Sequence, residues 1–326
     1  MTSEAIQTSI TSRGEPVTTN NFIRAETDTY FRTYAEKFDG FGKISHFRSL
    51  VPIDKQGVIR MNRDTLYSYG VFDLTSPVTI TKPNPEGRFQ SMILINQDHY
   101  VKLVSQEAGS YILDQERMGT RYIGVIFRTL INEVDPSDTA RANQLQDQIN
   151  FKQQNPGKLE LPDWDQASLK ATREPLLVLA GRMGDISRRF GDTNEVDPKQ
   201  HLVGTASGWG GNPPKAAMYI SIYPEKNDGK TPYVLTFPKV PVDGFWSISV
   251  YNKEGFIVAN DQKIYVINDR TAKPNADSTF TIRFGGDPKA LNYMPVMDGW
   301  NYTVRLYQPK EEILSGKWTF SNPKTA

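Results

Sequence analysis

The densest group of polar side chains in the sequence is the run Asn62-Arg63-Asp64-Thr65. It combines an amide, a bidentate cation, a carboxylate and a hydroxyl, which are groups that can bind and orient a small organic anion. In a functional interpretation Arg63 binds a substrate carboxylate or phosphate, while Asp64 orients it or acts as a base. In a structural interpretation Arg63 belongs to an internal ion pair, and the other side chains complete the turn before a strand.

The three histidines, His46, His99 and His201, have no spacing that is typical of a metal site. The sequence therefore predicts no metal ion, and no phosphate-binding or dinucleotide motif indicates a cofactor. His99 follows an apolar strand pattern that ends at Ile95, and strand ends commonly present polar side chains at the opening of a barrel. One hypothesis makes Asp64 and His99 a catalytic acid–base pair. The alternative is that His99 is a hydrogen-bonded structural residue.

Arg128 and Arg305 each interrupt or end an otherwise apolar strand pattern. A charged side chain in such a strand faces outward, or it belongs to a buried pair or an anion site. An anion site that also includes Arg63 is one hypothesis. Trp209 lies within Gly208-Trp209-Gly210-Gly211, whose glycines permit a close approach while the indole covers a pocket or the domain interface. The predicted ligand-binding residues are Asn62, Arg63, Tyr67, Arg128, Trp209, Tyr219, Trp246 and Arg305.

The elements that position these residues are mainly strands with helical insertions. Short apolar runs between Pro, Gly, Asn and Asp predict strands over residues 51–131, and helical spacing predicts helices over 20–38, 136–154 and 165–190. In residues 300–307 alternate side chains make an apolar face, while Asn301, Thr303, Arg305 and Tyr307 make the opposite face. Helices that cluster rather than alternate with strands argue against a Rossmann or TIM-barrel fold.

A chain of 326 residues exceeds one typical hydrophobic core and predicts two domains. The fold class expected is two jelly-roll-like β barrels or sandwiches in tandem. We predict a flexible N-terminal segment at 1–19, followed by an N-terminal helix and the first barrel at 20–155. A helical insertion or linker is predicted at 156–200 and the second barrel at 201–326.

Composition excludes several classes of function. The sequence holds 38 Lys and Arg against 37 Asp and Glu, for a net charge of +1, so no field would attract nucleic acid. It holds no cysteine, which excludes disulfides and thiolate chemistry. We expect a soluble protein with no membrane span, because no apolar run approaches the ~20 residues required. No signal peptide is recognisable in the sequence, and both the cytoplasm and the periplasm are compatible with it.

Two sets of motifs resemble a known family. The first runs over residues 61–68 and continues to Gly87-Arg88-Phe89. The second comprises residues 208–211, 241–251 and 304–309 and ends with Gly316-Lys317-Trp318. In this order they are similar to the bacterial tandem family of domains of unknown function twelve-fifty-four (N-terminal) and twelve-fourteen (C-terminal). The resemblance implies two jelly-roll barrels and a homo-oligomer, with a trimer as the suggested number, and it implies no established reaction.

Three functions follow as hypotheses. The first, which we favour, is the binding of a small and possibly anionic organic molecule in a pocket lined by aromatic and arginine side chains. The second is a cofactor-free enzyme that acts on a small organic acid, ester or ether through Asp64 and His99, with Arg63 or Arg128 as the anchor. The third is a structural protein whose barrels serve as building blocks of an assembly.

Overall fold

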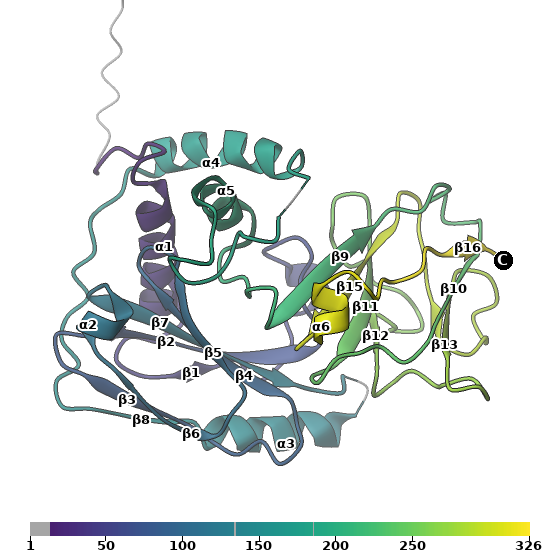
Figure 1. The fold of residues 1–326 in the computed structure, drawn as a ribbon, viewed down its shortest axis with the longest axis horizontal. Helices are drawn as coiled ribbons and strands as arrows, with labels where there is room; N and C mark the ends of the chain where they lie inside the picture. The colour runs from purple at the N-terminus through teal and green to yellow at the C-terminus, as the bar shows by residue number, and fades with distance from the viewer. Residues whose placement is uncertain (1–13, 134, 185) are drawn as a thin grey trace, which may run out of the picture.

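The computed structural model describes residues 14–133, 135–184 and 186–326 (Figure 1). Residues 1–13 of the predicted flexible segment 1–19 lie outside the described residues. Strands predominate over helices in the described chain, and most neighbouring strands are antiparallel, which confirms the prediction of a mainly β fold with helical insertions. The predicted domain boundaries stay a prediction.

Two sheets form a sandwich in the first half of the chain, in the orders β1-β2-β7-β4-β5 and β6-β3-β8. Apolar side chains from both sheets, including Phe72, Ile80 and Phe127, fill the space between them. The strands are β1 (Ser45–His46), β2 (Thr65–Asp73), β3 (Val78–Lys82), β4 (Gln90–Asn96), β5 (Val101–Ser105), β6 (Gly109–Leu113), β7 (Tyr122–Leu130) and β8 (Asn150–Gln153).

A second sandwich follows, with sheets in the orders β12-β11-β15-β9 and β14-β13-β10-β16. Its core contains Trp246, Phe284 and Trp300. The described sheets remain open, so the sandwich form of the prediction is confirmed and the closed barrel form is not found. The strands are β9 (Ala217–Ile222), β10 (Tyr233–Phe237), β11 (Trp246–Tyr251), β12 (Val266–Asn268), β13 (Phe280–Phe284), β14 (Tyr293–Met294), β15 (Asn301–Tyr307) and β16 (Lys324–Thr325).

Three helices pack together beside the larger sheet of the first sandwich, around Phe22, Leu169 and Val203 (Figure 1). These are α1, α4 and α5. A π-helical turn at Thr33–Lys37 continues α1, and a short 3-10 helix lies at Ile53–Lys55. The α-helices are α1 (Phe22–Arg32), α2 (Gln115–Met118), α3 (Pro136–Asp147), α4 (Gln166–Ala180), α5 (Pro198–Gly208) and α6 (Glu311–Leu314).

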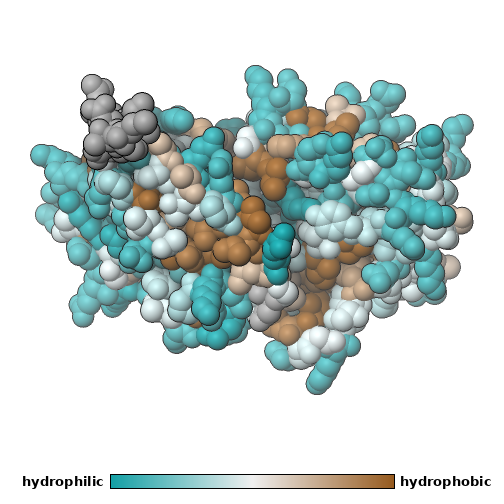
Figure 2. All heavy atoms as spheres, turned by 90° about the horizontal axis from the view of Figure 1, so that it is seen from above, coloured by the Kyte–Doolittle hydropathy of each residue, from teal (hydrophilic) through white to brown (hydrophobic). Residues whose placement is uncertain are grey.

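Each predicted helical range contains a helix, but the observed helices are shorter than the predicted ranges. The helix predicted at 136–154 ends at Asp147, because residues 150–153 form β8 and pair with β3. Helix α5 was not predicted, since its small residues at Gly204–Gly208 conceal the helical spacing. In α4, Leu177, Val178 and Leu179 are exposed. Figure 2, seen from the side of α4, shows hydrophobic residues gathered toward the middle of this view.

An ion pair joins α3 to the turn before β4. The guanidinium of Arg88 donates to both carboxylate oxygens of Asp138, at 2.9 and 2.6 Å, and also to the carbonyl of Leu130. Asp138 is buried and accepts a further bond from the Asn132 amide. The hydrogen bond from Arg88 is the largest cause that holds the pKa of Asp138 well below its ordinary value. This pair therefore stabilises the fold in a pH-dependent way.

We expect D138N to lower the free energy of unfolding by ~2–4 kcal/mol at pH 7, because it leaves the largely buried guanidinium of Arg88 without its Asp138 counter-charge. Since the pKa is depressed in the folded protein, this stabilisation is complete above the pKa of the unfolded chain, about 3.9. It is lost as the pH falls further toward the folded pKa. Urea unfolding from pH 7 to pH 3 should therefore show the difference between wild type and D138N shrinking below about pH 4.

D135N is the matched control, because Asp135 is a more exposed acid that caps the same helix and asparagine caps equally well. We expect it to change stability little at either pH. A D138N effect of equal size at pH 3 and pH 7 would contradict the ion-pair explanation.

Candidate functional site

The site begins on the face of the larger sheet that points away from the smaller one. Tyr67 on β2 lies directly opposite Arg128 on β7, and Ser91 on β4 lies opposite Arg128 on the other side. Opposing residues of antiparallel strands share a face, so Arg128 is flanked by these two side chains. Tyr69 and Trp209 pack beside Tyr67 against an apolar cluster that includes Ile126. A cation therefore lies at one end of an aromatic surface.

A polar face of the second sandwich meets this surface. Arg305 on β15 lies between Ser247 on β11 and Tyr219 on β9. The opposite face of β15 fills the apolar core, which confirms the alternation predicted for residues 300–307. Ser247 and Arg305 are nevertheless almost fully buried, because the loop that precedes β2 covers them. Ser247 donates to Asp64 of that loop at 2.6 Å.

Polar side chains from both sandwiches converge where these surfaces meet. The amide of Asn62 donates to the hydroxyl of Tyr67 at 3.3 Å and to that of Tyr307 at 3.2 Å. Asn212 donates to the hydroxyl of Tyr219 at 3.0 Å. Asn62, Tyr67 and Tyr219 retain solvent-accessible surface. We call this group the arginine–tyrosine cluster, and its members are Asn62, Tyr67, Arg128, Tyr219, Arg305 and Tyr307.

The two arginines of the cluster differ in how completely they are bonded. Arg305 donates to the Ser249 hydroxyl, to the Tyr251 hydroxyl at 2.6 Å and to the Arg60 carbonyl at 2.8 Å. Arg128 is buried, and its Nη2 donates to the Gly210 carbonyl at 2.8 Å. Its Nη1 is also buried, but it makes no hydrogen bond to any residue that the structure describes. Arg128 thus has no carboxylate partner among the described residues, and the phenol of Tyr67 is the titratable side chain that acts on it most strongly.

Tyr67 is the titratable group of the cluster whose pKa best suits it to donate or accept a proton. The guanidinium carbon of Arg128 lies 5.4 Å from the centre of its ring. Burial alone would raise the pKa of Tyr67, but the charge of Arg128 and the hydrogen bond from Asn62 lower it below 10.0. Burial raises the pKa of the neighbouring Tyr307 well above that value. The two phenols therefore differ in acidity.

His99 supports the cluster through the backbone of Gly210. Its Nε2 accepts from the Gly210 amide at 2.9 Å, and its Nδ1 lies 2.8 Å from the Thr205 hydroxyl. The accepting Nε2 places the proton on Nδ1, which donates to Thr205. Burial lowers the pKa of His99 well below its ordinary value, and the nearby His201 lowers it further. Both ring nitrogens therefore form hydrogen bonds. The residue bonded to Nε2 is Gly210, whose carbonyl accepts the hydrogen bond from Arg128.

The structure argues against proton exchange between Asp64 and His99. Asp64 bonds to the residue after β7, while the turn before His99 lies beside the start of β7. The strand between them spans ~26 Å at about 3.3 Å per residue. Both carboxylate oxygens of Asp64 accept bonds, from Ser247 and Asn268, and burial raises its pKa. The predicted acid–base pair is therefore not assembled.

Three predicted ligand-binding residues lie outside the cluster. Arg63 forms a bidentate ion pair with Glu133 and donates to the Val51 carbonyl, which agrees with the structural interpretation of the motif. Trp246 belongs to the core of the second sandwich, because Phe245 rather than Trp246 points toward the first. Trp209 borders the cluster, and its ring is stacked on Tyr30 at 4.3 Å. The other predicted residues, Asn62, Tyr67, Arg128, Tyr219 and Arg305, are brought together.

Sequence reasoning did not select Arg189, Asn212 or Tyr307. Tyr307 was assigned to the polar face of its strand, so the alternation that identified Arg305 could also have identified it. Asn212 follows the glycine-rich turn, where an amide beside a close backbone approach is a usable signal. Arg189 lies in a polar stretch between helices, and no pattern distinguishes it from Arg188.

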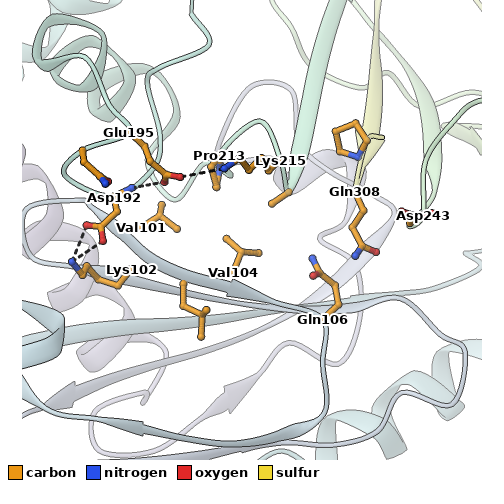
Figure 3. A pocket seen from close by; sticks show the side chains of 14 residues that line it. Val101, Lys102, Val104, Gln106, Asp192, Glu195, Pro213, Lys215, Asp243 and Gln308 are labelled. Atoms are coloured by element: carbon orange, nitrogen blue, oxygen red, sulfur yellow. Dashed lines mark hydrogen bonds and ion pairs between the residues drawn. The ribbon is translucent and has the colours of Figure 1, made fainter. Parts of the chain in front are cut away.

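A cavity of about 560 Å³ lies close to the cluster but differs from it in charge (Figure 3). Lys102 and Lys215 point toward it, and they bind Asp192 at 2.8 Å and Glu195 at 3.7 Å. The lysines that line the cavity are thus paired with carboxylates of the same chain. The segment 210–216 contributes to both places, because Gly210 and Asn212 bond to the cluster while Pro213, Lys215 and Ala216 line the cavity. The unpaired charge lies on the cluster side.

Neither a metal centre nor a membrane helix is found in the part of the chain that the structure describes. No three His, Cys, Asp or Glu side chains there are grouped as metal ligands. None of the described helices is both long and apolar enough to span a bilayer.

Two solved structures resemble this one over 94% of the chain. The VPA0106 protein from Vibrio parahaemolyticus is 19% identical and aligns over 97% of its own length with a TM-score of 0.74. An uncharacterised protein from Burkholderia cenocepacia is 12% identical and aligns over 87% of its length with a TM-score of 0.50. Likeness at these identities shows the fold alone. No curated protein matches the chain.

Family models account for both halves of the chain. Residues 41–153 match the protein of unknown function DUF1254, and residues 218–311 match the protein of unknown function DUF1214. The first match contains Asn62, Tyr67 and Arg128, and the second contains Tyr219, Arg305 and Tyr307, so the cluster is built from both. The matched order is the one expected from the motifs, and the chain belongs to the tandem DUF1254–DUF1214 family.

Proposed function

We propose that this protein binds a small organic acid in the arginine–tyrosine cluster, with an anionic group of the ligand on Nη1 of Arg128. The observation that carries the proposal is a buried guanidinium nitrogen without a partner among the described residues. Buried charges in proteins are normally paired, and an unpaired one is unfavourable by several kcal/mol. A carboxylate would relieve that penalty through charge-assisted hydrogen bonds.

The surroundings of Arg128 suit an organic anion better than a free inorganic one. Tyr67 and Tyr69 are stacked with ring centres 5.6 Å apart, and Tyr69 is stacked on Tyr34 at 4.4 Å. All three rings retain partial solvent exposure, although burial raises the pKa of Tyr34 and Tyr69. Rings that are surrounded by protein and still accessible offer an apolar wall to the body of a ligand. The hydroxyls of Tyr67 and Tyr219 supply further hydrogen bonds.

We expect carboxylates from acetate to benzoate, screened by thermal shift, to raise the melting temperature of the wild type in at least one case. R128M should abolish that rise, because it removes both the charge and the free donor. The ligand-free variant should unfold within ~1 kcal/mol of wild type, since loss of the bond to Gly210 offsets removal of an unpaired charge. No rise with any carboxylate, or an equal rise in R128M, would sink the proposal.

R63M is the matched control, because Arg63 is a buried arginine with a carboxylate partner. It should lower the free energy of unfolding by ~2–4 kcal/mol by leaving Glu133 unpaired. The shift caused by the carboxylate should stay as in wild type. Loss of ligand binding in R63M would instead favour an anion site at Arg63, within the motif Asn62-Arg63-Asp64-Thr65.

A second candidate function is proton transfer to or from a bound acid by Tyr67. It is favoured by the lowered pKa of this phenol and by its position beside Arg128.

The ionisation of Tyr67 also predicts how binding depends on pH. As the pH rises through a pKa below 10, the phenolate neutralises Arg128 and repels an incoming anion. Carboxylate affinity of the wild type, measured by calorimetry from pH 7 to 9.5, should therefore fall, while that of Y67F should stay level. Y307F should keep the fall, because the pKa of Tyr307 is raised. A level profile in wild type would contradict this role for Tyr67.

A homo-oligomer, with a trimer as the number suggested by the resemblance, is proposed independently of the ligand. Light scattering measures it directly. An open-ended assembly would favour the structural role over the binding role.

A further inference from the structure

We infer that the ligand carries two anionic groups, one on Arg128 and the second on Arg189, so that the site takes small dicarboxylic or comparably dianionic acids. This inference rests on the proposed function and names its ligand class. It begins from one observation: the buried guanidinium nitrogens that lack a partner among the described residues are Nη1 of Arg128 and Nε of Arg189.

Arg189 lies between α4 and α5, just before Phe190. Its guanidinium carbon is 5.1 Å from the centre of the Phe190 ring. No carboxylate of the described chain lies within ion-pair distance of it, whereas Arg63, Arg88, Arg121 and Arg173 each bind an acid. Burial lowers the pKa of Arg189, opposed by Tyr219. Among the described residues this cation thus has no carboxylate partner.

Several contacts place Arg189 and Arg128 on the same side of the molecule. Tyr219 acts electrostatically on both arginines. Phe190 also packs edge-on to His99 at 5.8 Å, and His99 holds the Gly210 amide whose carbonyl binds Arg128. Both arginines are therefore near enough to Tyr219 to interact with it electrostatically, and Tyr219 is partly exposed to solvent.

Two neighbouring positive charges in a partly buried environment repel each other and lose hydration. A monoanion compensates one of them and leaves the other unpaired. A dianion compensates both, and each carboxylate finds a donor that is already fixed in position. Binding should therefore be tighter for a diacid whose length matches the separation of the two guanidinium groups than for a monoacid of the same length.

The test compares malonate, succinate, glutarate and adipate with acetate, propionate, butyrate and valerate by calorimetry at constant ionic strength. We expect at least one diacid to bind wild type 10-fold or more tightly than the monoacids. R189M should reduce that diacid to the affinity of a monoacid and leave monoacid binding unchanged. R128M should remove the binding of both classes.

R188M is the control, because Arg188 is an exposed neighbour that bonds to backbone carbonyls. It should keep the preference for diacids, and R189K, which retains the charge, should keep part of it. Equal binding of monoacids and diacids that depends on Arg128 but not on Arg189 would overturn the inference and leave the proposed function standing. Absence of binding by either class would overturn the proposed function itself.

Discussion

The site depends on one guanidinium that is fixed in place without being neutralised. Arg128 is buried, and the Gly210 carbonyl and the Tyr67 ring hold it on either side. Both partners are neutral, so they orient the charge and leave it uncompensated. A carboxylate partner would fix the side chain equally well but would cancel its attraction for a ligand. The neutral partners leave this arginine, unlike Arg63, without a carboxylate partner among the described residues.

The proposed site also depends on how the two sandwiches pack against each other. A β sandwich of this kind usually turns the polar face of a sheet to solvent. Here β15 places Arg305 and Tyr307 against the first sandwich, where Asn62 bridges Tyr307 and Tyr67. Because each half contributes part of the hydrogen-bonding set, neither half alone can form the cluster. The site as proposed therefore requires both matched regions of the chain.

Local patterns in the sequence predicted the components of the site better than their arrangement. The alternation in residues 300–307 assigned Arg305 to a polar face, and the interruption of an apolar strand marked Arg128. The register that sets Tyr67 opposite Arg128 joins residues far apart in the chain, and no local pattern encodes it. Period-two spacing also shows that Phe245 and Trp246 face opposite ways without showing which of them faces the core. Arg63 and His99 looked functional because their partners lie elsewhere in the sequence.

His99 acts on the proposed site through the backbone of Gly210. Its neutral ring accepts from the Gly210 amide, and Gly210 has a φ of 77°, a conformation that favours glycine. The same peptide segment presents the Gly210 carbonyl to Arg128 and the Asn212 amide to Tyr219. Protonation of His99 would remove the acceptor for Gly210, and burial opposes that protonation by lowering the pKa. The imidazole therefore acts as a fixed acceptor, and through Gly210 it holds the guanidinium where a ligand would meet it.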